Sequence, residues 1–175
     1  MKQLSFLCLR LMKDIGEIGM ILGIDPGATG AIAFLWPDDF YMIDDLPIVD
    51  GIVNSSGLLT LLKKTRFPYI PQTVTFHHAF VERAQSMPKQ GIASTFKYGV
   101  GYGAILGVLA ALQIPYTLVS PQKWKKVFGL IGKDKEASRA LAIQWYPKAE
   151  LHLKKHHGRS EALLIARWGM AHGTT

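Results

Sequence analysis

Three carboxylate side chains in this sequence stand beside apolar segments, where an unpaired charge is costly. Asp25 follows a short apolar run and precedes a Pro-Gly turn, Glu82 ends a second apolar run, and Glu161 lies early in a third. Because like charges repel, carboxylates that meet at such positions persist mainly where a cation binds between them. Oxygen ligands of this kind are typical of Mg²⁺, for which Mn²⁺ can substitute.

Each carboxylate also has a purely structural interpretation. Asp25 opens a common turn sequence, and Glu82 could pair with an arginine or lysine at a strand end. Glu161 in a first helical turn would be stabilised by the helix dipole, with His156 and His157 exposed in a basic loop. If His157 instead shares a helical face with Glu161, four residues away, its imidazole could bind a metal or transfer a proton.

Basic residues outnumber acidic ones by 20 to 13, which gives a net charge of +7. A basic domain attracts polyanions, although a basic surface kept for solubility fits equally well. The segment Lys123-Trp124-Lys125-Lys126, followed by Lys135, surrounds an aromatic residue with positive charge. This pattern is typical of contact with a phosphate backbone. The alternative is that these basic residues lie on solvent-exposed faces and bind no ligand.

Aromatic residues downstream of Glu82 offer a second way to contact nucleic acid. Met87, Pro88, Phe96 and Tyr98 could stack on bases or wedge between them. Burial in the core is the commoner role of phenylalanine, so we expect Phe96 in the core.

Composition narrows the class of protein further. The one cysteine, Cys8, allows no intramolecular disulfide and makes a thiolate zinc site improbable, which fits a reducing compartment such as the cytoplasm. No apolar run approaches the roughly 20 residues of a membrane span, so no membrane partner is expected. We expect residues 1–19 to be an extension outside the fold and residues 20–175 to form a single domain.

The hydrophobic pattern predicts a mixed α/β domain, with three antiparallel strands, two parallel strands and helices on both faces. The strands are expected at Ile21–Ile24, Gly30–Trp36, Phe40–Leu46, Thr73–Val81 and Pro115–Val119. The helices are expected at Leu58–Lys64, Ala93–Leu112, Lys133–Trp145 and Gly158–Trp168. The last helix is apolar nearly all round and is expected to be largely buried.

Three glycines, Gly99, Gly103 and Gly107, fall four residues apart in the long second helix. Each costs a helix roughly 1 kcal/mol relative to alanine, so close packing against another element should offset that cost. Packing against the sheet of the same chain is at least as plausible as contact with a second chain.

A set of motifs in this order resembles the RuvC-type Holliday junction resolvases, most closely their phage-borne branch. The matching stretches are Gly23–Gly27 with Gly30, Val81-Glu82, Phe96–Gly99, Ser120–Lys126, Lys135–Arg139 and Gly158–Leu163. The resemblance implies an RNase H-like fold and a homodimer that makes paired nicks across a four-way DNA junction. It also implies that Asp25, Glu82 and Glu161 bind divalent cations, with His157 as a further ligand.

The resemblance also implies which residues contact DNA, and the sequence departs from the family pattern at two positions. The expected DNA-binding residues are Arg83, Lys97, Lys123, Lys125, Lys126 and Lys135. The family usually has aspartate where Glu161 stands, and another acid three residues earlier. Here the candidates for that acid are His156 and His157, and His157 is four residues before Glu161.

These features lead to one main hypothesis and two alternatives. The main hypothesis is hydrolysis of junction DNA with two metal ions roughly 4 Å apart, with Asp25 between them. The first alternative is a junction-binding protein of the same fold whose catalysis is weakened or lost. The second is an RNase H-like nuclease for another substrate, such as other branched DNA or an RNA–DNA hybrid.

Overall fold

A computed structural model describes residues 19–63, 76–85 and 91–173 of the chain. Its central feature is a five-stranded sheet in the order β3-β2-β1-β6-β7. The strands are β1 (Met20–Asp25), β2 (Ala31–Leu35), β3 (Tyr41–Asp45), β6 (Phe76–Glu82) and β7 (Tyr116–Val119). β1, β2 and β3 pair antiparallel, whereas β6 runs parallel to both β1 and β7. The predicted meander with two added parallel strands is therefore confirmed.

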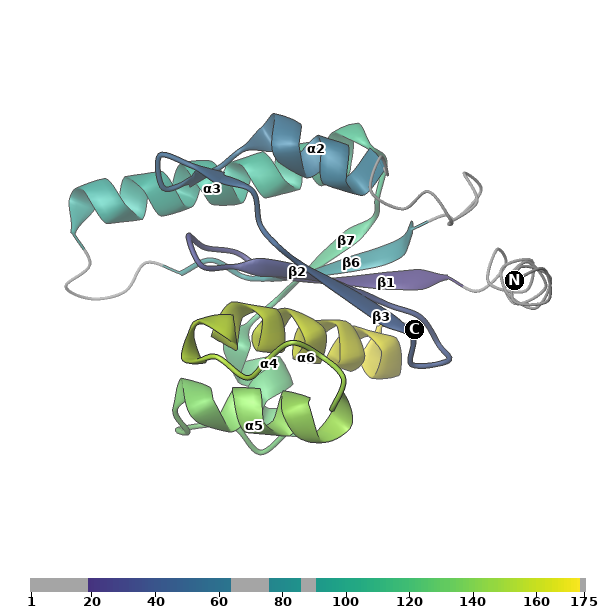
Figure 1. Cartoon of the computed structure of the whole chain (residues 1–175). Helices are drawn as coiled ribbons and strands as arrows, with labels where there is room; N and C mark the ends of the chain where they lie inside the picture. Colours follow the sequence, from purple (N-terminus) through teal and green to yellow (C-terminus); the bar gives the residue numbers. More distant parts are fainter. Residues whose placement is uncertain (1–18, 64–75, 86–90, 174–175) are drawn as a thin grey trace, which may run out of the picture.

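Helices cover both faces of this sheet (Figure 1). One layer holds α2 (Ser55–Lys63) and α3 (Ile92–Ala111). The other holds α4 (Pro121–Val127), α5 (Lys135–Trp145), a short 3₁₀ turn (Lys154–His156) and α6 (His157–His172). The four predicted helices are all present, with ends shifted by at most four residues.

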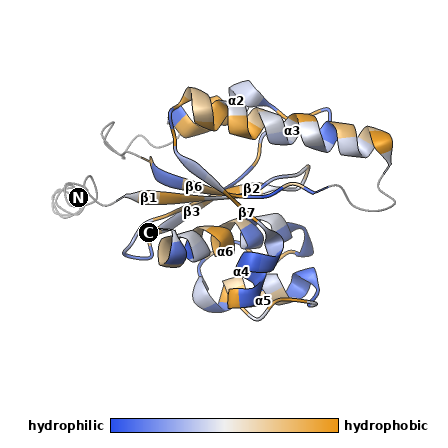
Figure 2. Cartoon of the chain, turned by 180° about the vertical axis from the view of Figure 1, so that it is seen from behind, coloured by the Kyte–Doolittle hydropathy of each residue, from blue (hydrophilic) through white to orange (hydrophobic). Residues whose placement is uncertain are grey.

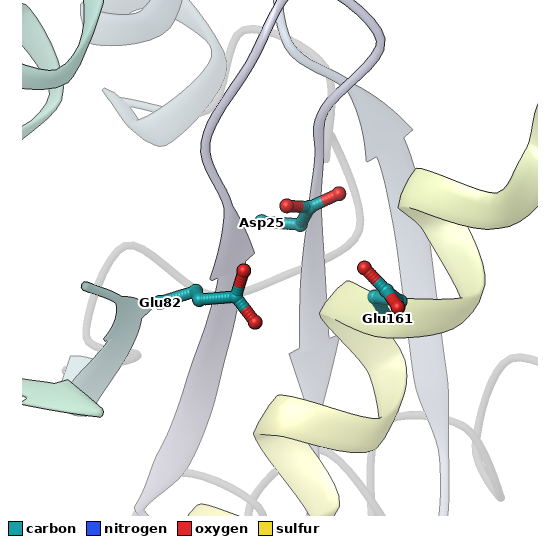
Figure 3. Close-up of side chains that lie close together, drawn as sticks. All are labelled: Asp25, Glu82 and Glu161. Carbon is teal, nitrogen blue, oxygen red and sulfur yellow. The ribbon is translucent and has the colours of Figure 1, made fainter. Parts of the chain in front are cut away.

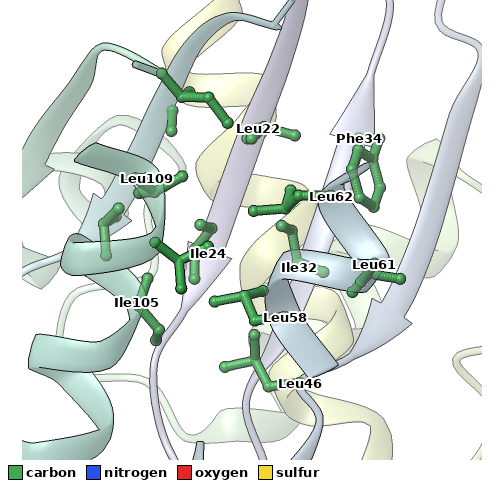
Figure 4. Close-up of a cluster of buried hydrophobic side chains, with 14 of the residues drawn as sticks. Leu22, Ile24, Ile32, Phe34, Leu46, Leu58, Leu61, Leu62, Ile105 and Leu109 are labelled. Atoms are coloured by element: carbon green, nitrogen blue, oxygen red, sulfur yellow. The ribbon is translucent and has the colours of Figure 1, made fainter. Parts of the chain in front are cut away.

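Two hydrophobic cores follow from the alternation of side chains along the strands. Leu22, Ile24, Ile32 and Phe34 point toward α2 and α3, where they pack with leucines and isoleucines of these helices (Figure 4). The alternate residues point toward α6, whose segment Ser160–Ala166 is buried throughout. A sheet buried on both faces needs continuous apolar strands, as the sequence of β1 and β2 shows.

Two short elements were not predicted from the sequence. β4 (Ile48–Val49) and β5 (Ile52–Val53) form a hairpin around Asp50-Gly51, where both residues have positive φ. Asp-Gly between apolar pairs is a strong hairpin signal. It was missed because the prediction followed the longer apolar patterns of the neighbouring strand and helix. α4 was also missed, although Ser120 caps it and Pro121 occupies its first turn.

Several expectations about α3 are corrected by the structure. An alanine Cβ at Gly99, Gly103 or Gly107 would meet nothing within 4 Å, so these glycines do not pack against the sheet. Gly101 makes that close approach instead, against Val53. Phe96 is 70% exposed and lies outside the core, contrary to the prediction. The N-terminal half of α3 extends past the sheet in both views, which explains the exposure (Figures 1 and 2).

α3 is also long and apolar enough to cross a membrane by length and composition alone, with a mean hydropathy of 1.2. This differs from the prediction that no apolar run in the sequence approaches the length of a membrane span. The helix packs one side, including Ile105 and Leu109, into the core below α2 and α3. A helix of a folded domain passes the same test, so this feature is weak support for a membrane span.

Other predictions fall outside the described residues. They are the extension at residues 1–18, the first three residues of the strand Thr73–Val81, and the loop residues Met87 and Pro88.

Candidate metal centre and DNA interface

Asp25 and Glu82 come together because they end two neighbouring parallel strands. Ile24 pairs with Val81, so the next residue of each strand, Asp25 and Glu82, lies at the same edge of the sheet. Glu161 reaches that edge from the second turn of α6, and Figure 3 shows all three carboxylates close together. One oxygen of each lies within 4.8 Å of one oxygen of the others.

α6 can place Glu161 there because glycines allow it to approach the sheet. A Cβ on Gly23 of β1 would lie 2.1 Å from the carbonyl oxygen of Ala162, the residue after Glu161. One turn earlier, a Cβ on Gly158 would lie 2.1 Å from the Thr29 carbonyl oxygen and 3.2 Å from Asp25 Oδ2. Because of these short distances, the backbone leaves no room for a side chain at Gly158. This position is three residues before Glu161.

Burial and the repulsion of neighbouring carboxylates disfavour the charged forms of Asp25 and Glu82. Burial, followed by the charges of Glu161 and Glu82, raises the pKa of Asp25 well above its usual value, although Lys135 and Lys125 oppose this. Burial also raises the pKa of Glu82, and the hydrogen bond from Trp124 acts in the opposite direction. A cation between the carboxylates would remove the repulsion, so the charge distribution fits a metal site.

The geometry also fits a divalent cation. Magnesium–oxygen distances are about 2.1 Å, so opposite ligands of one ion lie roughly 4 Å apart. The trio, within 4.8 Å, needs at most a small closure to share an ion. The ligands are all oxygen, which favours Mg²⁺ or Mn²⁺ over softer metals.

Glu161 is engaged by polar groups of the neighbouring helices. Lys125 Nζ of α4 lies 2.9 Å from Glu161 Oε1, and Ser138 Oγ of α5 donates to the same oxygen over 3.4 Å. Glu161 is only 6% exposed and lies beyond the first turn of α6. The alternative of a first-turn carboxylate stabilised by the helix dipole is therefore wrong. The exposed position expected for His156 in that alternative is also wrong, because His156 is 8% exposed.

His157 lies outside the carboxylate trio. Its Nε2 is 3.4 Å from Lys135 Nζ and 3.3 Å from Thr29 Oγ1, and its Nδ1 is 3.3 Å from the Lys154 carbonyl oxygen. A lysine ammonium can only donate, so Nε2 accepts and Nδ1 carries the proton. The structure thus directs His157 toward Lys135 and Thr29.

The burial of Trp124 is the largest difference from the predicted DNA-binding surface. It was expected among the lysines that face phosphate, but it is fully buried, and its Nε1 donates to Glu82 Oε2 over 2.7 Å. The apolar pair Trp124 and Phe128, four residues apart, is the sequence signal for this burial. The charges of Asp25 and Glu82 also act on Tyr98, whose pKa is raised to about 12, with burial as the largest cause.

The other predicted DNA-binding residues do not all lie on the same helical layer. Lys123, Lys126 and Lys135 are exposed on α4 and α5, whose layer carries many hydrophilic residues (Figure 2). Arg83, directly after Glu82, is also exposed. Lys97 of α3 donates to the Asp50 carbonyl oxygen over 3.2 Å, on the other helical layer.

Comparison with known proteins gives two kinds of likeness, and no family model matches the sequence. The chain is 34% identical over 96 residues to a chloroplastic Holliday junction resolvase of Chlamydomonas reinhardtii. The match covers 53% of this chain, and the chain spans only 11% of the length of that relative.

Solved structures show the same fold. The RuvC of T. thermophilus in complex with a Holliday junction substrate superposes with a TM-score of 0.57 and 15% identity. It covers 89% of this chain and 97% of that chain, and a second Thermus thermophilus RuvC structure gives a TM-score of 0.56 over the same shares. The RNase H-like fold expected from the sequence is therefore confirmed.

Proposed function

We propose that this protein is a metal-dependent endonuclease that cuts four-way DNA junctions. The observation that carries the proposal is the trio Asp25, Glu82 and Glu161, held within 4.8 Å on the fold of RuvC. The likeness to a protein named as a Holliday junction resolvase supports the choice of substrate.

Each residue of the site has a defined part in this proposal. Asp25, at the centre, would hold both of two divalent cations, and Glu82 and Glu161 would hold one each. When bound, such ions activate a water for attack on the phosphodiester and stabilise the leaving 3′ oxygen. Lys135, whose charge acts on Asp25, and His157, whose Nε2 lies 3.4 Å from Lys135 Nζ, would orient the scissile phosphate by charge and hydrogen bonding. The exposed Lys123 and Lys126 would contact neighbouring phosphates without reading sequence.

A homodimer belongs to the same proposal. The projecting half of α3 exposes Ile92, Phe96 and Val100, which are 91%, 70% and 43% accessible. An exposed apolar row of this kind is typical of an interface, and Gly99 and Gly103 beside it would let a second helix approach closely. Two sites in a symmetric dimer would cut two of the four strands of a junction symmetrically.

Cleavage of a synthetic four-way junction tests the proposal directly. We expect the protein to cut the junction with Mg²⁺ or Mn²⁺ and to leave it intact with EDTA. Asp25→Asn should abolish cleavage while junction binding, measured by fluorescence anisotropy, stays within about threefold. The matched control is Asp50→Asn, in the exposed β4–β5 turn, which should cut normally. Normal cleavage by Asp25→Asn would refute the mechanism.

Gly158 supports one alternative, a junction-binding protein with weakened catalysis. A site that leaves no room for a side chain at Gly158 has fewer ligands than one with a second acid on α6. The same assay separates the alternatives, because binding without cleavage in either metal would favour this one. Flaps, replication forks and RNA–DNA hybrids belong in the same panel, since preferential cutting of any of them would replace the four-way junction as substrate.

A further inference from the structure

Trp124 connects the most buried part of α4 to one carboxylate of the candidate metal centre. Its Nε1 donates to Glu82 Oε2 over 2.7 Å, and the side chain is fully buried. A hydrogen bond to a charged acceptor is among the stronger kinds in proteins. Within the described chain, Trp36 and Trp168 have buried Nε1 atoms without any hydrogen-bond partner. Burial of a tryptophan here therefore does not by itself require a carboxylate partner.

The strand register brings Trp124 to Glu82. Glu82 pairs with Val119 at the end of β7, and the backbone N–H of Arg83 donates to the Val119 carbonyl oxygen. Ser120 follows at once and caps α4, its hydroxyl accepting from the N–H of Lys123. The first turn of α4 thus starts beside Glu82, and Trp124 points back to it.

Packing fixes the indole in that position. Trp124 contacts Phe128 with ring centroids 6.4 Å apart, and Phe128 meets Trp145 of α5 edge-on at 5.2 Å. Lys125 Nζ lies 4.9 Å from the centroid of the same indole and 2.9 Å from Glu161 Oε1. One dipeptide of α4 therefore contacts two of the three carboxylates.

We propose that Trp124 is a positioning residue that holds Glu82 in the orientation needed to bind a divalent cation. The terminal torsion of a glutamate is broad, so an unrestrained Glu82 would present its oxygens in many directions. The indole N–H fixes Oε2 and thereby limits where Oε1 can lie. This inference rests on the proposed function, because it assumes that Glu82 is a metal ligand.

The test compares two tryptophan-to-phenylalanine variants by calorimetric titration with Mn²⁺ alone, without DNA. Trp124→Phe keeps an aromatic ring and removes the N–H donor. Trp36→Phe is the matched control, because Trp36 is 2% exposed and its Nε1 has no partner among the described residues. Loss of a partner to a metal ligand typically weakens metal affinity 10- to 100-fold. We expect that loss for Trp124→Phe and less than a twofold change for Trp36→Phe.

A measurement on the unaltered protein covers the case in which Trp124→Phe fails to fold. The chain has four tryptophans, so the indole N–H resonance of Trp124 can be assigned by elimination with variants of the other three. We expect this resonance to shift on titration with Mg²⁺ along the same binding curve as the metal, and the Trp36 resonance to stay in place. A Trp124 resonance that does not shift when Mg²⁺ is added would overturn the inference.

The outcomes also separate this inference from the proposed function. Wild-type affinity in Trp124→Phe, or an equal loss in Trp36→Phe, overturns the positioning role and leaves the nuclease proposal standing. A wild-type protein that binds no Mn²⁺ overturns both. Cleavage at saturating Mn²⁺ adds a further readout: a positioning role predicts that the rate of Trp124→Phe recovers at least partly as metal is raised.

Discussion

At the scale of single residues, the site contains two acids, Asp25 and Glu82, whose charged forms the protein itself disfavours. Asp25 and Glu82 have pKa values raised by burial, and Asp25 is further affected by the two glutamates beside it. Lys125 relieves part of this repulsion through its ion pair with Glu161 at 2.9 Å. The carboxylates thus stay close at a cost in stability that a bound cation would reverse.

This cost leads to a prediction about pH in metal-free protein. The pKa of Asp25 is raised in the folded state, so the folded protein holds its proton longer than the unfolded chain does. Its contribution to stability is full below the unfolded pKa, near 4, and is lost as the pH rises through the folded pKa. In EDTA, Asp25→Asn should therefore unfold at a higher temperature than wild type at pH 7, and the gap should close toward pH 4.

A gain of about 1 kcal/mol corresponds to roughly 2–4 °C in a domain of this size. Thermal unfolding from pH 4 to pH 8, followed by circular dichroism, measures it, with Asp50→Asn as the control. Added Mg²⁺ should stabilise wild type but not Asp25→Asn. Equal pH profiles for the three proteins in EDTA would contradict the account.

At the scale of elements, the contact between α6 and β1 decides where Glu161 lies. α6 crosses β1 at Gly23, where its backbone comes closer than any side chain would allow. The ion pair between Arg159 and Asp45, at 2.7 Å, ties the same helix to β3. α6 is therefore fixed to the sheet on both sides of Glu161.

Gly23→Ala should break this contact. Its methyl group would lie 2.1 Å from the Ala162 carbonyl oxygen and 2.4 Å from the Ala166 nitrogen, both backbone atoms that cannot move alone. We expect a loss of about 3 kcal/mol or more in the free energy of unfolding, because overpacking a core typically costs 1–3 kcal/mol and here the helix itself must shift. Urea unfolding measures this loss.

Gly107→Ala in α3 is the contrasting substitution. Its methyl group would meet nothing within 4 Å, and alanine is the better helix former, so stability should rise by about 0.5–1 kcal/mol. If both substitutions change stability by similar amounts, close packing at Gly23 is not what holds α6.

At the scale of the whole molecule, the helical layers on the two faces of the sheet expose different kinds of residues. The layer of α4, α5 and α6 carries the basic residues around the carboxylates. The layer of α2 and α3 carries the exposed apolar row of Ile92, Phe96 and Val100. A molecule with its acidic site on one side and a hydrophobic row on the other suits the proposed dimer, in which each subunit keeps its site open to DNA.

Phe96→Glu should convert that dimer to a monomer. The side chain is 70% exposed, so the change adds charge to the row without disturbing the core. Sedimentation velocity should show a dimer for wild type and a monomer for Phe96→Glu. Leu153→Glu, at a 43% exposed leucine on the opposite layer, should remain a dimer. A monomeric wild-type protein, or a dimeric Phe96→Glu, would rule out this interface.

The sheet, most helices and the three acidic residues could be predicted from the sequence alone. Short apolar runs bounded by turn signals, such as Ile21–Ile24, are typical of buried strands, and a carboxylate at the end of such a strand lies at the edge of the sheet. Local patterns carry this information because alternation and helical period depend on neighbouring residues alone. Three features could be seen only in the folded chain: Trp124 faces Glu82, Phe96 is exposed, and His157 lies beside Lys135. Those outcomes depend on how closely α3, α4 and α6 approach the sheet, which is set by contacts between residues far apart in the chain.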